Sequence, residues 1–379
     1  MKKNSKILGI LGSGQLARMT AIAAQQYGYS VYIYCNDNHL SPAEHVATKT
    51  IKGNFNDLHS IMDFCSLCDV VTLENEFIDQ EILQYIDHHQ PKKLFPDSET
   101  FKKIGDKISE KEHFQSHGLR VTPFLKVKSI SDVLAFAEIH SFPLILKSAK
   151  GGYDGFGNLT IKNKDELTNN FSKLKGDLLV EAFIPYEMEC AIMVARNADD
   201  QIVSYPIAHT IQENHICHFV AVPAQIDSII ALEIEKMAIK AMKTLNAVGI
   251  FAFEFFITKD KEIYLNESAP RPHNSGHYSI EGCETSQFSN HVRAVLNLPL
   301  GSPALTSKNI LMLNLLGTQN GPALLGPLNS FFQIEKGYLH LYGKMESKIG
   351  RKMGHFTLLG DDLKHMENKL KQLKGCYYL

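Results

Sequence analysis

The sequence predicts a mixed α/β and α+β protein of two to three domains, the first of them a doubly wound parallel sheet. The length of 379 residues corresponds to two or three domains of ordinary size. A short apolar run over residues 6–11 ends in Gly12-Ser13-Gly14, and helical spacing follows over 15–27. Strand-like runs at 30–35 and 69–73 then recur at the intervals of βα units, which is typical of a parallel sheet.

Two proline-containing segments divide the rest of the chain. Residues 91–98 combine two prolines with polar side chains, ahead of a predicted helix over 101–117. Residues 299–307, rich in Pro, Gly and Ser, form the second joint, and a strand-rich segment follows it. We therefore predict an N-terminal domain over 1–98, a central domain over 99–298 in which strands and helices alternate, and a small C-terminal domain over 299–379.

Composition and charge exclude several classes of protein. The chain is 44% hydrophobic and 21% charged, as expected of a folded globular protein rather than a disordered one. The net charge of −2 supplies no overall cationic field for a polyanion, so we predict no nucleic-acid partner. No apolar run approaches the roughly 18 residues of a membrane span, so we predict no membrane partner and a cytoplasmic location.

The seven cysteines are odd in number and scattered along the chain, which favours reduced thiols over a disulfide framework. Cys65 and Cys68 have the spacing of a metal-binding pair. No second pair follows at the distance of a zinc finger, so we expect ordinary buried thiols on a helix.

The glycine turn after the first strand, Gly12 to Ala17, can hold a phosphate on backbone N–H groups at a helix N-terminus. Asp37 lies 23 residues beyond Gly14, at the end of the second predicted strand, as in dinucleotide-binding proteins. The same pattern also marks tight packing between a strand and a helix. A nicotinamide-dependent oxidoreductase is therefore one functional alternative.

A second glycine-rich segment follows Lys147, at the end of a predicted strand over 143–147. Four glycines between positions 151 and 157 let the backbone fold over a polyphosphate, with the lysine as a point charge beside it. The alternative is a flexible hairpin tip. The glycines alternate with Tyr, Asp and Phe, which favours the phosphate interpretation.

A predicted β-hairpin carries two carboxylates that should share a metal ion. With Asp260-Lys261 as a two-residue loop, strand pairing places Glu254 directly opposite Glu267. Like charges facing each other beside several phenylalanines are unfavourable unless a cation joins them. Hard oxygen ligands suit Mg²⁺, whose remaining sites are often filled by water and substrate phosphates. The alternatives are a solvent-facing Glu254 on an edge strand and a buried arginine partner.

The loop after this hairpin, residues 268–277, contains two prolines and a glycine, so it is not helical. His273 and His277 therefore do not form a zinc pair on one helix face. Arg271 can clamp a carboxylate or a phosphate with two parallel hydrogen bonds. The alternative is a merely polar loop. A basic cluster near the C-terminus, composed of Lys344, Lys348, Arg351 and Lys352, is either a solvated face or a phosphate pocket.

Taken together, these segments resemble the 5-(carboxyamino)imidazole ribonucleotide synthetases of purine biosynthesis, ATP-dependent carboxylases of the ATP-grasp superfamily. The similarity runs nearly end to end in the same order, and the string from Ala269 to His277 is highly specific. The matching segments are Gly14-Gln15-Leu16, Gly152-Tyr153-Asp154-Gly155, Asn266-Glu267, Ala269 to His277, Thr285-Ser286-Gln287-Phe288 and Gly350-Arg351-Lys352-Met353-Gly354-His355.

The resemblance implies a fold and an activity. The fold is a pre-ATP-grasp N-terminal domain, an ATP-grasp domain with a flap subdomain (about 120–180) and a metal-site subdomain (about 181–298), and a small C-terminal domain. The activity is the carboxylation of aminoimidazole ribonucleotide with ATP and bicarbonate, which releases ADP and phosphate by way of carboxyphosphate. Mg²⁺ is the implied metal, and a homodimer is the implied assembly.

The resemblance also implies roles for particular residues. ATP phosphates would contact Lys107 and Lys147 beneath a flap of Gly152, Tyr153, Asp154, Gly155, Phe156, Gly157 and Asn158. Adenine and ribose would contact Glu181, Ala182, Phe183, Ile184, Glu189 and Gln212, and Asn266 and Glu267 would complete the nucleotide and metal contacts opposite Glu254. The ribonucleotide would contact Gln15, Glu74, Tyr153, Asp154, Arg271, Lys344, Arg351 and Lys352. The catalytic set would be Lys147, Arg271, His273 and Asn274.

Two further alternatives remain at this stage. One is a sister ATP-grasp ligase that acts on another purine intermediate, which would share the nucleotide and metal residues. The other is a non-catalytic metabolite-binding protein descended from an enzyme.

Overall fold

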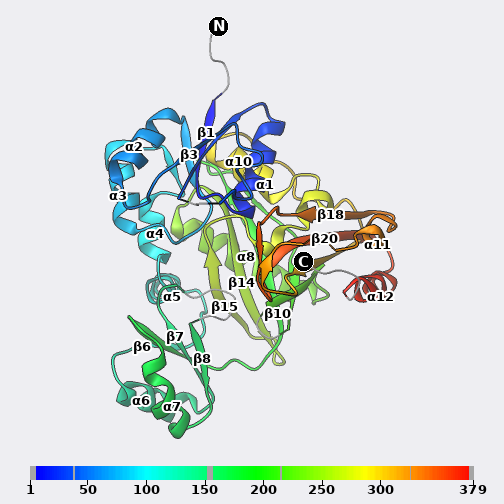
Figure 1. Cartoon of the computed structure of the whole chain (residues 1–379). Coiled ribbons are helices and arrows are strands. Elements are labelled where there is room, and N and C mark those ends of the chain that lie inside the picture. The colour runs from blue at the N-terminus through cyan, green and yellow to red at the C-terminus, as the bar shows by residue number, and fades with distance from the viewer. Residues whose placement is uncertain (1–5, 37–38, 152–156, 214–215, 325, 375–379) are drawn as a thin grey trace.

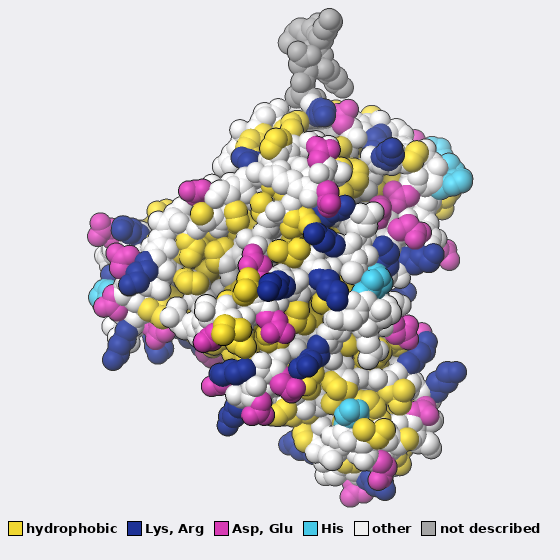
Figure 2. Space-filling view, turned by 180° about the vertical axis from the view of Figure 1, so that it is seen from behind, with side chains coloured by type: hydrophobic (Ala, Val, Ile, Leu, Met, Phe, Trp, Pro, Cys, Tyr) yellow, Lys and Arg dark blue, Asp and Glu magenta, His cyan; other side chains and the backbone are white. Residues whose placement is uncertain are grey.

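The computed structural model describes residues 6–36, 39–151, 157–213, 216–324 and 326–374. In Figure 1 the N-terminal domain lies at the top, the sheet of β14 and β10 lies below it, and a small subdomain that carries β6 to β8 projects at the bottom. No helix of the described ranges is long and apolar enough to cross a membrane. On the face shown in Figure 2, basic and acidic side chains are interspersed.

The N-terminal domain is a parallel sheet with helices on both faces, which confirms the predicted doubly wound architecture. Its strand order is β3-β2-β1-β4-β5. Alternate β1 residues pack on opposite faces: Leu8 and Ile10 contact the α1 side, and Ile7 and Leu11 contact the side of α2 and α3. The elements are β1 Ile7–Leu11, α1 Gln15–Gln26, β2 Ser30–Cys35, β3 Lys49–Lys52, α2 Leu58–Leu67, β4 Val70–Leu73, α3 Gln80–His89 and β5 Leu94–Phe95.

The predicted helix over 101–117 is wrong in one respect, because the structure has two helices there. Helix α4 spans Ser98–Ile104 and α5 spans Lys107–Ser116. Asp106 lies between them in an extended conformation, and its carboxylate accepts hydrogen bonds from the backbone N–H groups of Ile108 and Ser109. The break lets α5 start in a new direction, with Lys107 at its first position.

The projecting subdomain is a four-stranded antiparallel sheet of order β6-β9-β7-β8, covered by α6 and α7. Its elements are β6 Phe124–Val127, α6 Ile130–His140, β7 Leu144–Ser148, β8 Asn158–Ile161, α7 Lys164–Asn170, η1 Phe171–Lys173 and β9 Leu178–Ala182. The predicted strand over 143–147 corresponds to β7, so Lys147 lies on a strand next to β8 and β9.

The largest sheet joins the central and C-terminal parts of the chain. Its order is β15-β14-β10-β12-β13-β16-β20-β18, with β11 beside β10, so it continues across the predicted boundary at residue 299. Its elements are β10 Tyr186–Arg196, β11 Ile202–Ser204, β12 Ala208–Glu213, β13 Ile216–Val222, α8 Ser228–Leu245, β14 Gly249–Thr258, β15 Ile263–Ala269, η2 Asn274–Gly276, α9 Ser279–Gly282, α10 Gln287–Val295, β16 Asn309–Leu316, β17 Gly321–Pro322, α11 Asn329–Phe332, β18 Gly337–Leu341, β19 Glu346–Ser347, β20 Lys352–Gly360 and α12 Leu363–Leu373.

The six described cysteines are buried thiols without disulfides. Cys65 lies in α2 and Cys68 caps it, and burial raises the pKa of each thiol to about 12. This confirms the prediction of ordinary buried thiols for the pair.

His291 in α10 connects the N-terminal sheet to the large sheet. Its Nδ1 accepts a hydrogen bond from the Ile250 backbone N–H of β14 at 3.2 Å, which leaves Nε2 to donate to Thr72 Oγ1 of β4 at 2.9 Å. The imidazole is buried, and burial lowers its pKa to about 4. The folded protein therefore holds this histidine neutral at pH values where an unfolded chain would protonate it.

We expect this histidine to make the protein less stable in acid. The unfolded chain takes up the proton as the pH falls below about 6.5, so the free energy of unfolding decreases from there to about pH 4. Over that pH range, His291 lowers the free energy of unfolding by about 3 kcal/mol. Urea unfolding between pH 4 and 7 measures it. His291→Gln should flatten the pH dependence, whereas His365→Gln at an exposed position should leave it unchanged. Equal slopes for the two variants would contradict the assignment.

Candidate active site

One cavity of about 1650 Å³ gathers the predicted site residues. It is lined by the first glycine turn, α5, the end of β9, the β14–β15 hairpin, the loop after it and the C-terminal basic residues. The predicted residues that line it are Gln15, Glu74, Lys107, Lys147, Asn158, Glu181, Ala182, Phe183, Ile184, Glu189, Gln212, Glu254, Asn266, Glu267, Arg271, His273, Asn274, Lys344, Arg351 and Lys352. Gly157 is described but does not line it, and Gly152, Tyr153, Asp154, Gly155, Phe156 and Asp37 lie outside the described residues.

Glu254 and Glu267 are directly opposite each other on β14 and β15, as predicted. The predicted two-residue loop is wrong: Thr258 accepts from the N–H of Lys261 and donates to the carbonyl of Glu262, so the loop spans 259–261. A β-bulge at Asn266 restores the expected pairing, because Phe255 faces Leu265 while Glu254 faces Glu267. The two deviations from the ideal hairpin cancel at the carboxylates.

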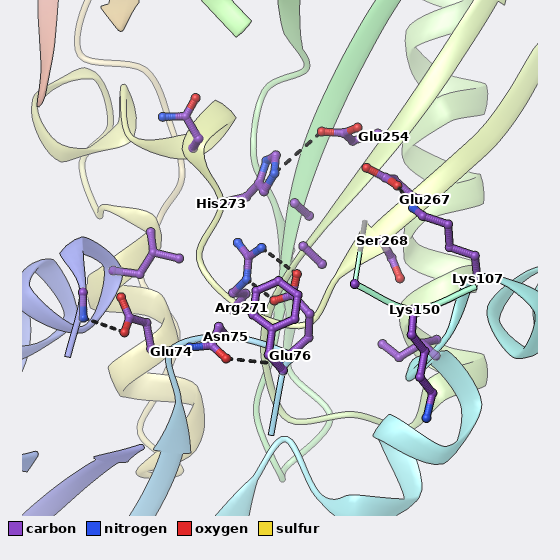
Figure 3. Close-up of a pocket in the computed structure, with 18 of the residues that line it drawn as sticks. Glu74, Asn75, Glu76, Lys107, Lys150, Glu254, Glu267, Ser268, Arg271 and His273 are labelled. Atoms are coloured by element: carbon purple, nitrogen blue, oxygen red, sulfur yellow. Dashed lines mark hydrogen bonds and ion pairs between the residues drawn. The ribbon is translucent and has the colours of Figure 1, made fainter. Parts of the chain in front are cut away.

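The two carboxylates, Glu254 and Glu267, have different electrostatic surroundings. Lys107 Nζ lies 2.5 Å from Glu267 Oε2, and this cation lowers the pKa of Glu267 to about 2. Burial and the facing carboxylates raise the pKa of Glu254 well above its usual range. His273 Nε2 lies 3.7 Å from Glu254 Oε1, but burial and Arg271 lower the His273 pKa to about 3, so it is no cation at neutral pH. Figure 3 shows both carboxylates pointing into the same space.

This arrangement fits a hard divalent cation. The Asn266 Oδ1 atom, on the bulge between the carboxylates, is buried without a hydrogen-bond partner. An orphaned oxygen acceptor beside two facing carboxylates is the donor set that Mg²⁺ prefers. The described residues contain no group of three or more His, Cys, Asp or Glu side chains that could hold a metal by themselves. A cation here would therefore take further ligands from water or a bound phosphate.

Lys147 is fixed at the wall of the cavity by Glu181. Its Nζ lies 3.0 Å from Glu181 Oε2, and Lys111 Nζ lies 3.3 Å from Oε1 of the same carboxylate. The two lysines lower the pKa of Glu181 to about 2 despite its burial. The Glu181 side chain is thus occupied by two lysines. A ligand at this segment would therefore contact the backbone from Glu181 to Ile184.

A second polar group lies on β10 and β12. Glu189 accepts a hydrogen bond from Gln212 Nε2 at 2.8 Å and from Thr210 Oγ1 at 3.3 Å. Burial raises the pKa of Glu189, and Gln212 Oε1 is buried without a partner. These are acceptors that a pair of ribose hydroxyls could satisfy.

The glycine turn of the N-terminal domain holds an internal carboxylate. Glu74, just after β4, accepts a hydrogen bond from the Gly14 N–H at 2.6 Å at the start of α1. A Cβ atom at Gly14 would lie 2.2 Å from the Glu74 carboxylate, so the glycine is needed for this close approach. The Glu74 carboxylate therefore takes the place at the helix N-terminus where a dinucleotide pyrophosphate would bind. This finding disfavours the oxidoreductase alternative.

The loop after β15 places Arg271 against a carboxylate from the N-terminal domain. Its Nε and Nη2 donate to Glu76 at 2.5 and 2.9 Å, and both side chains are part-buried. Nη1 donates to the Pro272 carbonyl at 3.3 Å, so these contacts together fix the plane of the guanidinium at the wall of the cavity. Further along the loop, the amides of Asn274 and Asn314 exchange hydrogen bonds at 2.8 Å.

Three of the C-terminal basic residues, Lys344, Arg351 and Lys352, line the same cavity. Lys344 Nζ donates to the Lys352 carbonyl at 2.6 Å, and Arg351 Nη1 donates to the Glu346 carbonyl at 2.8 Å. These bonds are to uncharged carbonyl groups, so they bring no negative charge to the cluster. Lys348, also part of the predicted cluster, does not line the cavity.

Several charged residues at the site were not predicted. Glu110 and Lys111 in α5 are buried, although a run of Lys, Glu and His in a helix is typical of a solvent-exposed face. Glu76 was close to the predicted Glu74, but only the structure pairs it with Arg271. No local sequence signal separates these residues from ordinary surface charges, because their partners lie far away in the chain.

Comparisons with known proteins agree with this geometry. Residues 5–104 match the model of the ribonucleotide synthetase preATP-grasp domain, 112–288 the ATP-grasp domain, and 311–369 the phosphoribosylaminoimidazole carboxylase C-terminal domain.

Three similar proteins are matched over nearly their whole length. The N5-carboxyaminoimidazole ribonucleotide synthase of Bacillus subtilis is 36% identical, with 93% of this chain and 91% of that protein covered. An ADP complex of an N5-carboxyaminoimidazole ribonucleotide synthetase superposes with a TM-score of 0.90 at 35% identity, covering 97% and 96% of the chains. The Aspergillus clavatus enzyme, solved with ADP and 5-aminoimidazole ribonucleotide, has a TM-score of 0.88 at 32% identity, with 98% of each chain covered.

Proposed function

Because this chain belongs to the N5-carboxyaminoimidazole ribonucleotide synthetase family of ATP-grasp enzymes, we propose that it carboxylates 5-aminoimidazole ribonucleotide. ATP and bicarbonate would be the co-substrates, and ADP and phosphate the other products. The observation that carries the proposal is one cavity that unites two lysines, two facing carboxylates and Arg271. A phosphoryl group, a divalent cation and a small anion can meet there.

The nucleotide would lie between the β9 segment and the β14–β15 hairpin. Lys107 and Lys147 would offset the charge of its phosphates, and Glu189 with Gln212 would bind the ribose hydroxyls. The backbone of Glu181 to Ile184 would bind adenine. The flap residues 152–156 belong to this proposal through the family resemblance alone.

Mg²⁺ is part of the proposal, with Glu254 and Glu267 as its carboxylate ligands and Asn266 Oδ1 as a further oxygen within the bulge. When bound, it would supply electrostatic stabilisation of the phosphate oxygens. It would also relieve the repulsion that raises the pKa of Glu254.

The chain's own part in the reaction would be positioning and electrostatics. Arg271, His273 and Asn274 would hold bicarbonate in line with the γ-phosphorus, while Lys147 stabilises charge on the transferred group to form carboxyphosphate. The amine of the ribonucleotide would then capture carboxyphosphate or the CO₂ that it releases. Gln15, Glu74, Lys344, Arg351 and Lys352 would hold the ribonucleotide, with the basic side chains on its 5′-phosphate.

We expect ADP release in the presence of Mg²⁺ and bicarbonate to be stimulated specifically by 5-aminoimidazole ribonucleotide. The cavity holds cations for two phosphorylated ligands, so the second nucleotide should be needed for efficient turnover. A coupled ADP assay with and without the ribonucleotide measures this, and other purine intermediates serve as controls. Stimulation by a different intermediate would favour the sister-ligase alternative, and saturable NADH binding without ADP release would favour the oxidoreductase.

A homodimer and a cytoplasmic location complete the proposal. The described cysteines are buried thiols, which fits a reducing compartment. The assembly follows from the family resemblance, and light scattering of the purified protein would test it.

A further inference from the structure

Helix α5 directs three charged side chains at three consecutive residues of β15. Lys107 pairs with Glu267, Glu110 accepts from the N–H and hydroxyl of Ser268 at 2.6 and 2.5 Å, and Lys111 donates to the Asn266 carbonyl at 3.1 Å. Positions 107, 110 and 111 share one face of the helix. The proposed metal carboxylate is therefore held between two anchored neighbours.

Lys111 is the most enclosed of these charges. Its side chain is 2% exposed. It donates hydrogen bonds to Thr122 Oγ1 at 2.6 Å and to the Asn266 carbonyl at 3.1 Å, and it forms an ion pair with Glu181 Oε1 at 3.3 Å. These three partners lie ahead of β6, on β15 and on β9, respectively. A single ammonium thus joins the two halves of the cavity that would enclose the nucleotide.

The contact with Glu181 continues to Lys147. The other carboxylate oxygen of Glu181 accepts from Lys147 Nζ and from Thr122 Oγ1, each at 3.0 Å. Displacing Lys111 would leave Glu181 held through Oε2 alone, and the position of Lys147 on the cavity wall would be less firmly fixed. Lys111 itself does not line the cavity, so it can affect a ligand only through these neighbours.

A buried charge is costly unless every partner is in place, and an apolar side chain of similar length could fill the same space. The charge at position 111 is therefore best explained by the three groups that its two hydrogen bonds and its ion pair hold in place. We propose that Lys111 is a positioning residue for the nucleotide: it aligns Glu181, and through it Lys147, with the strand that carries Asn266 and Glu267. This inference rests on the proposed use of ATP and deepens it.

The test compares Lys111→Met with Thr122→Val by titrating ADP and Mg²⁺ in a calorimeter. Lys111→Met should raise the ADP dissociation constant at least about tenfold, and Thr122→Val about threefold, with the number of binding sites per folded chain unchanged. In turnover, the ATP KM should rise while the ribonucleotide KM stays within about twofold. A purely structural role would instead lower the number of competent sites and leave the dissociation constant as it was.

The matched control is Lys103→Met. Lys103 Nζ donates to the Leu245 carbonyl at 2.8 Å, away from the cavity, so both affinities should be unchanged. If Lys111→Met fails to fold in a thermal melt, Thr122→Val decides the question alone. An unchanged ADP dissociation constant in the folded variants overturns the inference. Because ADP binding needs no turnover, this result stands apart from a failure of the wild-type protein to carboxylate the ribonucleotide.

Discussion

Replacing Glu267 by Gln is expected to lower kcat/KM for ADP release by about 10³-fold, which corresponds to about 4 kcal/mol of lost transition-state stabilisation. Glu267 faces Glu254 across the hairpin and pairs with Lys107 at 2.5 Å. The amide keeps the shape of the carboxylate but loses the charge that would bind the cation and balance the lysine. Steady-state kinetics over a range of Mg²⁺ concentrations should show that added Mg²⁺ restores little of the rate.

The matched control for Glu267→Gln is Glu262→Gln, just before the same strand. Glu262 pairs with Arg120 at 3.1 Å, half-exposed and outside the cavity, so its replacement should change kcat/KM by less than about twofold. A thermal melt is needed as well, because Glu267→Gln removes the carboxylate partner of the part-buried Lys107. If a variant with both Glu254→Gln and Glu267→Gln still produced phosphate, this result would contradict the metal site and the functional assignment that depends on it.

Arg271→Lys is expected to lower kcat/KM for carboxylation by about 10²-fold while ADP binding stays unchanged. Arginine binds Glu76 with two N–H groups and the Pro272 carbonyl with a third, which fixes its plane at the cavity wall and leaves further N–H donors; a lysine ammonium cannot reproduce this planar geometry. The substitution should therefore weaken the positioning of the small anion and lower the amount of product formed per ADP released. Simultaneous assays of ADP and of carboxylated ribonucleotide measure that coupling.

Arg120→Lys provides the control for this change, since Arg120 forms an exposed ion pair with Glu262 on the protein surface. Both activities should remain near wild type in that variant. If Arg271→Lys instead weakened ADP binding and left the product yield per ADP unchanged, Arg271 would belong to the nucleotide side of the cavity.

The β14–β15 hairpin shows how much of the candidate site a local sequence pattern predicts. A two-residue loop at Asp260-Lys261 predicted Glu254 opposite Glu267, and the structure confirms the pairing. The hairpin that produces this pairing differs from the predicted one, because a three-residue loop and the bulge at Asn266 replace the ideal two-residue turn. The bulge could not be predicted, since its position depends on how β15 packs against α5.

The predicted helix over 101–117 shows a related limit. Gly105 and Asp106 permit a break but do not require one, because both residues also occur within helices at a modest cost. In the structure the chain breaks there, and Lys107, Glu110 and Lys111 of α5 contact partners on β15 and β9 that lie far away in the sequence.

The sequence by itself determined the order of the strands and helices, the glycine turns, the carboxylate pair and the family, because those depend on side-chain period, backbone preference and short strings of residues. The tertiary structure alone decided which charges are buried and with whom they pair. Glu74 beneath the glycine turn, Glu76 on Arg271, and Lys111 between two sheets are all brought to partners remote in sequence. Their ionisation follows from desolvation and distance, which no local pattern contains.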